Sequence, residues 1–389
     1  MCPWFESRWY HKRQADPIGP LVLLSDSPSC MNTPQLDPQL LGLLNWIDET
    51  RPNRLAVVMD RNTERHCLPL LTPLLPPHTD FLCLSQSGEE VKRIEHAYAL
   101  WSSLDEAGFD RHGAIIGLGG GTVTDLTGFV ASTYLRGLDF WLIPTTLLGM
   151  VDAATGGKTG INLGGAKNRI GTFSHPSGVS LCPDFLDTLP ERHVRSGMAE
   201  HVKHLLIALD LHSVSQRIES LPKGTAPLDG DAFSELILES VAIKEHIVAQ
   251  DPTESTGMRK QLNLGHTAGH AFESWALSEG HDLLHGEAVA WGLGVELAIS
   301  ALRAGLASDS GQLLMTLSNA IQQVLPCPVS PPAADVLWPW ALMDKKNEGD
   351  RVQMVLLSED GTPEVDQFVS FDEFDAAYRA VSSTGTTQA

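Results

Sequence analysis

The feature that most constrains this chain is a change in hydrophobic pattern near residue 184. Before it, short apolar runs at Leu55–Asp60, Phe81–Ser85, Gly113–Gly121 and Asp139–Thr146 alternate with stretches of helical spacing. Strands and helices that alternate over short connections form parallel sheets covered by helices. The first part of the chain is therefore expected to be a layered α/β unit.

Beyond this point, helical periodicity dominates. Apolar residues recur at helical spacing in segments 193–209, 231–250, 265–278 and 286–305, as in amphipathic helices. The exception is the run 351–361, which predicts a hairpin strand. We therefore divide the chain into four parts, which are an irregular extension (1–35), an α/β domain (36–184), a mainly helical domain (185–381) and a frayed tail (382–389).

Charge and composition exclude several classes of partner. The chain has 27 Lys and Arg against 48 Asp and Glu, a formal net charge of −21, and such a surface repels nucleic acid and anionic membranes. Its six cysteines contain no CxxC pair, which is typical of reduced thiols in a cytoplasmic protein. The first 30 residues lack the apolar block of a signal peptide, and Pro144 interrupts the longest apolar stretch. These features predict a cytoplasmic protein that binds neither nucleic acid nor membranes.

A glycine-rich turn, Gly117–Asp125, follows one predicted strand and precedes a predicted helix. Backbone amides at such a helix start can bind a phosphate group. The turn does not match the dinucleotide-binding pattern GxGxxG, because Thr122 stands where the last glycine is required. A nucleotide-binding turn and a plain tight turn both remain possible.

A second glycine-rich segment, Thr155–Thr159, resembles the end of a Walker A loop. It fails that pattern because Asp152 occupies the position of the first glycine, so ATP hydrolysis by this route is not expected. Lys158, followed by Lys167 and Asn168, still suits a phosphate group. A small anion site and a solvated basic loop are both consistent with this segment.

Histidines are concentrated in the second half, where nine of the fifteen lie between residues 193 and 285. His266 and His270 are four residues apart and share one helix face, and His281 and His285 repeat this spacing. A catalytic zinc needs three His or carboxylate ligands and one open position. Glu200 with two of these histidines meets that count, although single histidines are more often structural.

Four cations, Lys244, Arg259, Lys345 and Lys346, lie close to apolar runs. Each alone is best explained as ordinary surface charge. Combined with a glycine-rich phosphate turn and a metal, they would suit a substrate that carries a carboxylate and a phosphate.

From about Asp60 to Leu357, the chain resembles the 3-dehydroquinate synthase family. The matching blocks are GEEVK (88–92), GGGTVTDLTGFVASTYLRG (119–137), PTTLL (144–148), VDAATGGKTGIN (151–162), AKNRIG (166–171), TLPERHVRSGMAEHVKH (188–204), NLGHTAGHAFE (263–273), LLHGEAVAWG (283–292) and MDKKNEG (343–349). The resemblance implies a Rossmann-like NAD-binding α/β domain, followed by a mainly helical domain that binds metal and substrate. It also implies a homodimer in which Arg136 reaches the phosphate site of the neighbouring subunit.

The resemblance also implies roles for individual residues. The ligands of a divalent metal, zinc or cobalt, would be Glu200, His266 and His285. The NAD-binding residues would be Asp60, Asn62, Glu89, Lys92, Gly120, Gly121, Thr122, Asp125, Thr145, Thr146, Leu148, Asp152, Lys158, Lys167, Asn168, Thr188 and Leu189. The residues around the substrate would be Arg136, Asp152, Lys158, Asn168, Lys203, Lys244, Arg259, Asn263, His270 and one of Lys345 and Lys346.

The implied reaction is that of a carbon–oxygen lyase acting on a phosphorylated sugar acid. It converts 3-deoxy-D-arabino-heptulosonate 7-phosphate to 3-dehydroquinate and phosphate in the shikimate pathway, towards chorismate and the aromatic amino acids. NAD is transiently reduced, phosphate is eliminated, the hydride returns, and an intramolecular aldol reaction closes the ring. His270 would move the C5 hydroxyl proton, Lys158, Asn168 and Arg136 would hold the phosphate, and Arg259 and Lys244 the carboxylate.

Three alternatives compete with this interpretation. Another sugar phosphate cyclase would act on a substrate without the carboxylate, but Arg259, Asn263 and His270 match the dehydroquinate synthases. A metal-dependent polyol dehydrogenase of the same fold would release NADH, and the KTGIN and AKN segments argue against it. A non-catalytic binding protein would not need the metal and lysine residues. One departure from the family is His193, where a glutamate is common.

Overall fold

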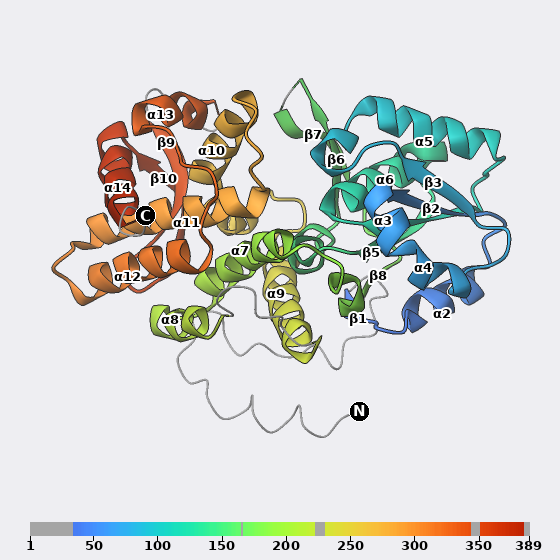
Figure 1. Ribbon diagram of the computed structural model, residues 1–389, viewed down its shortest axis with the longest axis horizontal. Helices are drawn as coiled ribbons and strands as arrows, with labels where there is room; N and C mark the ends of the chain where they lie inside the picture. Colours follow the sequence, from blue (N-terminus) through green and yellow to red (C-terminus); the bar gives the residue numbers. More distant parts are fainter. Residues whose placement is uncertain (1–33, 165, 222–229, 344–350, 385–389) are drawn as a thin grey trace.

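The computed structural model describes residues 34–164, 166–221, 230–343 and 351–384. Two halves lie side by side in Figure 1, one built around a parallel sheet and the other made mainly of helices. This arrangement confirms the expected fold class. Of the predicted N-terminal extension, only the last residues are described, and Gln35–Leu36 forms a short strand, β1. Lys345 and Lys346 lie outside the described residues.

The first half contains a six-stranded parallel sheet. Its strands, in spatial order, are β1 (Gln35–Leu36), β8 (Gly178–Leu181), β5 (Asp139–Pro144), β4 (Ala114–Gly119), β2 (Leu55–Asp60) and β3 (Asp80–Leu84). Every residue of β2 and β4 is buried, as expected for central strands covered on both faces. The four predicted strands are confirmed, whereas β1 and β8 were missed because each is short.

Helices pack against this sheet, α6 against β4 and β5, α5 against β3, α3 against β2 and α2 against β8, and Figure 1 draws α5 above the strands. The helices are α2 (Leu41–Thr50), α3 (Arg61–His66), α4 (Leu68–Leu71), α5 (Ile94–Glu106) and α6 (Gly121–Thr133). Short helical turns are η1 (Thr72–Leu74), η2 (Gly88–Val91), η3 (Tyr134–Arg136), η4 (Gly149–Ala153) and η5 (Pro183–Leu186). Of these, η4 is a single π-helical turn, a feature often found at functional sites.

The basic segment after residue 157 forms an antiparallel hairpin rather than an open loop. Its strands are β6 (Lys158–Leu163) and β7 (Ala166–Phe173). It packs against α6, where Gly128 leaves room for Thr159, since a Cβ on the glycine would lie 2.6 Å from the threonine Cγ2. The Ser132 and Thr172 hydroxyls also meet at 2.8 Å. The hairpin is therefore a fixed support for the basic residues that it carries.

The second half is organised around one long helix, α11. The helices are α7 (Glu191–Ala208), α8 (Leu211–Ser220), α9 (Gly230–Gln250), η6 (Met258–Asn263), α10 (His266–Ser278), α11 (His285–Ala304), α12 (Asp309–Val324), α13 (Ala334–Leu342) and α14 (Phe371–Thr384). Residues 286–301 of α11 are all buried, because α7, α10, α12 and α14 pack around it.

The predicted C-terminal strand is confirmed as β9 (Val352–Leu357), which pairs with β10 (Pro363–Val369). Helix α14 continues to Thr384, so it includes the first residues of the predicted frayed tail. Among the residues that the structure describes, no helix combines the length and the apolar character that crossing a bilayer requires.

The start of α10 is held by a buried carboxylate from α11. Glu296 accepts hydrogen bonds from the backbone N–H groups of Gly265, at 2.6 Å, and Ala268, at 3.2 Å. These N–H groups have no partner within α10, because the first turn of a helix leaves its donors free. Glu296 is completely buried, and burial raises the pKa of its carboxyl group to about 8. It therefore fixes the turn from which His266 projects.

Replacing Glu296 with leucine should destabilise the helical half. The Glu296→Leu change keeps a similar volume but leaves two buried N–H groups without an acceptor, which costs about 1–3 kcal/mol. Urea unfolding followed by circular dichroism should show an earlier transition. The control is Glu364→Gln, on the exposed β10 surface. An unchanged transition for Glu296→Leu would contradict the capping role.

The raised pKa of Glu296 also predicts a dependence of stability on pH. Between its ordinary pKa of 4.5 and the folded value of about 8, the folded chain binds this proton while the unfolded chain releases it. The contribution of Glu296 to stability therefore falls as pH rises through this window. The side chain of the Glu296→Gln variant cannot titrate. Its melting temperature should therefore decline less than that of the unmodified protein as the pH rises from about 5 to about 8.

Candidate functional site

The predicted cofactor residues gather at the carboxyl ends of the central strands. The chain passes from β2 outward to β3 and then returns to β4 on the other side of β2, so the connection direction reverses between β2 and β4. Ligands of open α/β sheets bind at such a point. Asp60 ends β2, Gly119–Gly121 joins β4 to α6, and Thr145 and Thr146 follow β5. The Thr145 N–H donates to the Gly119 carbonyl at 2.9 Å, which joins two of these strand ends.

Close packing requires glycine at the turn between β4 and α6. A Cβ on Gly119 would lie 2.5 Å from the Val123 Cβ, and one on Gly121 would lie 2.9 Å from the Ala153 Cβ. These contacts are with the protein's own side chains, and a Cβ on Gly120 would lie 3.0 Å from the Thr146 Cγ2. The tight turn itself therefore requires glycine, and it stands at the start of a helix, where backbone amides can bind a phosphate.

A buried lysine links this region to the β6–β7 hairpin. The Lys92 ammonium donates to the Asp125 carboxylate at 2.7 Å and to the Asn168 side-chain oxygen. Burial disfavours the charge on Lys92, but Asp125 and Glu89 outweigh it and raise its pKa. Asn162, which the sequence analysis missed, donates to Glu89 at 2.8 Å. Its only signal was its place at the end of the KTGIN block.

The π-helical turn η4 places Asp152 among cations from two helices. Its Oδ1 lies 2.9 Å from the Lys244 Nζ, 3.5 Å from the Lys203 Nζ and 3.3 Å from the His204 Nε2. Burial opposes ionisation of Asp152, but Lys203 and Lys244 outweigh it and hold its pKa well below the ordinary value. His204 is fully buried and was missed, although it lies one turn after Glu200 on α7.

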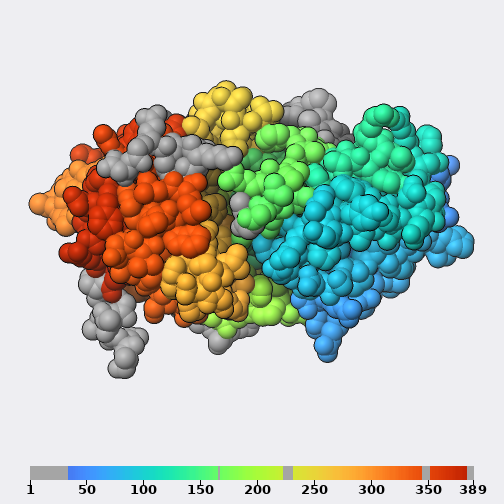
Figure 2. All heavy atoms as spheres, turned by 90° about the horizontal axis from the view of Figure 1, so that it is seen from above, coloured from blue at the N-terminus to red at the C-terminus, as the bar shows by residue number. Residues whose placement is uncertain are grey.

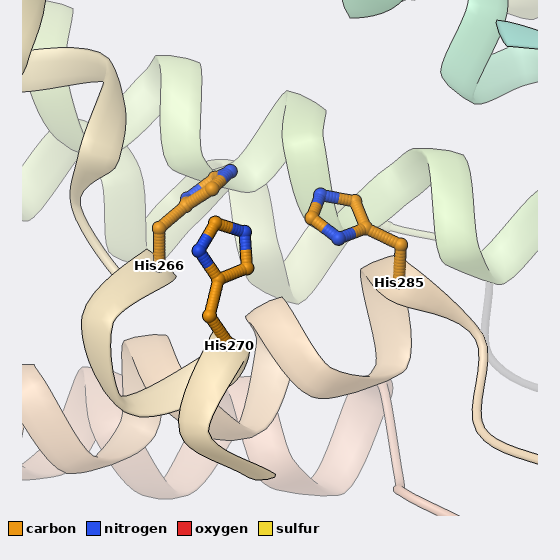
Figure 3. A group of neighbouring side chains, drawn as sticks. All are labelled: His266, His270 and His285. Carbon is orange, nitrogen blue, oxygen red and sulfur yellow. The ribbon is translucent and has the colours of Figure 1, made fainter. Parts of the chain in front are cut away.

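Three histidine rings converge between α10 and α11 (Figure 3). His266 and His270 project from the first two turns of α10, and His285 is the first residue of α11. One nitrogen of each lies within 4.8 Å of the others. The Glu200 Oε1 lies 3.2 Å from the His285 Nε2 and 3.6 Å from the His266 Nε2. By contrast, His281 is exposed and its ring lies against Trp275, with centroids 5.2 Å apart.

These side chains fit a divalent metal. Glu200 is fully buried, and among the described residues nothing donates a hydrogen bond to its Oε1. A buried anionic oxygen without a partner is unfavourable, and a cation shared with two imidazoles removes that penalty. Burial lowers the pKa of His266 to about 3, so its ring is neutral and retains a lone pair for a metal.

Residues from the two halves also contact each other directly. The Arg259 guanidinium donates to the Gly156 carbonyl at 3.0 Å, and the Lys158 ammonium pairs with Glu254 at 2.7 Å. The space-filling view shows the halves meeting along a furrow (Figure 2). The predicted substrate residues thus come from both sides of the boundary between the halves.

Other predicted residues are not joined to these groups by the hydrogen bonds or ion pairs of the described residues. Asn62 is exposed on α3, and Arg136 is exposed in η3. Thr188 and Leu189 lie just before α7, and Asn263 ends η6. Thr122 directly follows the glycine turn, in the first turn of α6. Leu148 precedes η4 and lies near the same turn in space, since a Cβ on Gly121 would lie 3.7 Å from its Cδ2.

Comparison with known proteins places the chain in a family. Residues 82–196 match the 3-dehydroquinate synthase N-terminal family and residues 197–347 match its C-terminal counterpart. A 3-dehydroquinate synthase from Parabacteroides distasonis is 35% identical over 329 residues, or 84% of this chain and 91% of that protein. One from Latilactobacillus sakei is 44% identical over 282 residues, or 72% of this chain and 75% of that protein.

Solved structures share the same fold. A 2-epi-5-epi-valiolone synthase from Streptomyces hygroscopicus, with NAD+ and Zn2+ bound, has a TM-score of 0.73 and 26% identity, covering 92% of this chain and 99% of that one. An iron-containing alcohol dehydrogenase, at 15% identity and a TM-score of 0.57, covers 90% of this chain and 98% of that one, and shares the fold alone. The sequence matches across both halves, together with this fold, show that the chain belongs to the 3-dehydroquinate synthase family.

Proposed function

We propose that this protein converts 3-deoxy-D-arabino-heptulosonate 7-phosphate to 3-dehydroquinate and phosphate, as a carbon–oxygen lyase of the shikimate pathway. The observation that carries the proposal is the convergence of Glu200 and three histidines beside a buried cluster of lysines. Family membership supports the same reaction, because relatives at 35% and 44% identity are named 3-dehydroquinate synthase.

NAD is the cofactor, and we place it at the end of the sheet, where β2 and β4 diverge. Asp60, the Gly120–Gly121 turn, Thr145 and Thr146 would line its site, and Lys92 and Asp125 would anchor the neighbouring hairpin. NAD supplies a reversible acceptor for the hydride of a substrate alcohol. The 2-epi-5-epi-valiolone synthase, a neighbour at 26% identity, holds NAD+ and Zn2+.

The protein uses a divalent metal, and Glu200, His266 and His285 are its proposed ligands. A divalent ion supplies Lewis acidity at a substrate oxygen. His270 lies against both other rings, at centroid distances of 5.2 Å and 5.7 Å, and its side chain is exposed. Desolvation by the surrounding protein, with the neighbouring His285, lowers the pKa of its imidazole to about 4, so near pH 7 the ring is neutral and can accept a proton from a substrate hydroxyl.

Buried cations give this acidic protein a local site for an anion. Arg259 is 2% exposed, and among the described residues its Nε has no hydrogen-bond partner. That free donor is suited to a substrate carboxylate, which a guanidinium recognises with a planar fork. Lys244 and Lys203 both contact Asp152, and we place them in the same anion site. We assign the phosphate to Lys158 and Asn168.

We also propose that the protein is a cytoplasmic homodimer. Arg136 is exposed, and none of the hydrogen bonds or ion pairs within the described chain occupies it. A guanidinium in that state can reach the phosphate site of a second copy. Sedimentation with and without phosphate measures the oligomeric state directly.

The proposed reaction should release phosphate without net formation of NADH. Purified protein with catalytic NAD and zinc is given 3-deoxy-D-arabino-heptulosonate 7-phosphate, while phosphate and absorbance at the NADH band are recorded. Prompt phosphate release with constant absorbance is expected, because the hydride returns to the substrate. If phosphate were released from a heptulose phosphate that lacks the carboxylate, and not from 3-deoxy-D-arabino-heptulosonate 7-phosphate, the protein would be another sugar phosphate cyclase. Steady NADH accumulation with a simple polyol would indicate a dehydrogenase.

Two histidine variants separate a ligand from a neighbouring residue. His266→Ala should lower the metal content to near zero and reduce phosphate release at least about 100-fold, because a site with two remaining ligands binds metal poorly. His281→Ala, outside the cluster, should retain both. Metal content is measured by elemental analysis after dialysis. Equal losses in the two variants would contradict the proposed ligand set.

A further inference from the structure

One buried carboxylate beside the histidine cluster has no role in the proposal above. Glu273 lies on α10, one turn after His270, and is 7% exposed. Helix capping does not require a glutamate here, because it lies in the middle of the helix. Its contacts therefore have to explain its presence.

Glu273 contacts two different parts of the site with its two oxygens. Its Oε2 lies 3.5 Å from the Nδ1 of His285. Its Oε1 accepts a hydrogen bond from the Lys167 ammonium at 2.7 Å. Lys167 belongs to β7 in the first half, whereas His285 starts α11 in the second. One side chain thus connects the hairpin with a proposed metal ligand.

The His285 ring is held between two carboxylates. Its Nε2 faces the Glu200 Oε1 at 3.2 Å, and its Nδ1 faces Glu273. A carboxylate at one ring nitrogen keeps the proton on that nitrogen and leaves the lone pair of the other for a metal. The same contact restricts rotation of the ring. Glu273 is thus suited to select the tautomer and orientation that a metal ligand needs.

We infer that Glu273 is a positioning residue that orients His285 for metal binding and couples this orientation to Lys167 on the β6–β7 hairpin. The inference rests on the proposed metal site. Lys167 and His285 share one carboxylate, each at its own oxygen. An anion that attracts Lys167 would leave Glu273 to His285 alone, so anion binding at the hairpin and metal binding should strengthen each other.

Two substitutions separate positioning from simple charge. Glu273→Gln removes the negative charge but keeps an acceptor for the His285 Nδ1–H, whereas Glu273→Ala removes both. The dissociation constant of Co2+ from the metal-freed full chain is measured by competition with a chelator. We expect an increase of about 10–100-fold for Glu273→Ala and a smaller increase for Glu273→Gln. The Co2+ absorption spectrum should change more in the alanine variant.

The control is Glu373→Gln, on α14 and away from the cluster. It removes a carboxylate that pairs with Arg303 of α11 at 2.9 Å. It should leave the Co2+ affinity and spectrum unchanged. Equal effects of Glu273→Gln and Glu273→Ala would overturn positioning and leave only a charge effect. Unchanged affinity in both would overturn the whole inference. If Glu273→Ala does not fold, the inference requires that Glu273→Gln binds Co2+ measurably more weakly and has an altered Co2+ absorption spectrum.

The coupling has a separate test. Lys167→Met breaks the ion pair from the other side and leaves Glu273 to His285, so Co2+ should bind as tightly as before or more tightly. Inorganic phosphate should increase Co2+ affinity in the unmodified protein and should not do so in Lys167→Met. An unchanged phosphate effect in Lys167→Met would overturn the coupling. These measurements use no substrate, so failure of the proposed reaction would be seen separately in the phosphate-release assay.

Discussion

The arrangement of the site depends on a set of charges that are buried together. Glu200 and Lys203 on α7 are removed from water and Asp152 on η4 is mostly so, and each is acceptable there only because opposite charges face it. Removing one partner would leave another charge buried and unpaired, which is strongly unfavourable. Helix α7, the π-helical turn and α9 are therefore held at one mutual distance. The carboxylate of Glu200 points towards the histidines because its helix has no freedom to turn away.

Close backbone contacts bring the ligand-bearing helices into range of that carboxylate. A Cβ on Gly269 would lie 2.9 Å from the Ala288 carbonyl oxygen, so α10 and α11 touch through their backbones. A Cβ on Gly197 would lie 2.6 Å from the Leu147 Cβ, which seats α7 against the segment before η4. Larger residues at these positions would separate the helices and widen the site. The small residues thus have a geometric role in a cluster whose chemistry is supplied by others.

The same fold carries other chemistry, because alcohol dehydrogenases of low sequence identity share it. The proposed function would separate this chain from them through the side chains around the boundary between the halves. A dehydrogenase needs a hydride acceptor and a metal, whereas the proposed reaction also requires groups that hold a carboxylate and a phosphate. In the proposed site, Arg259, Lys158 and the β6–β7 hairpin would supply cations for that purpose. The ion pair between Lys167 and Glu273 connects the hairpin, through Glu273, to the proposed metal ligand His285, so the two demands would be met by one connected structure.

Local patterns in the sequence determined much of this protein. Apolar runs of strand length predicted β2 to β5, and the spacing of His266 and His270 placed both on one helix face, because these features depend only on neighbouring residues. The β6–β7 hairpin escaped prediction, since its strands are rich in small and basic residues and are stabilised by packing on α6. The contacts of Asp152 with Lys203, His204 and Lys244, and of Glu273 with Lys167, join segments far apart in the chain. Only the tertiary structure decided those pairs, because a buried charge selects its partner by proximity in space, and proximity between distant segments is set by how the whole chain packs.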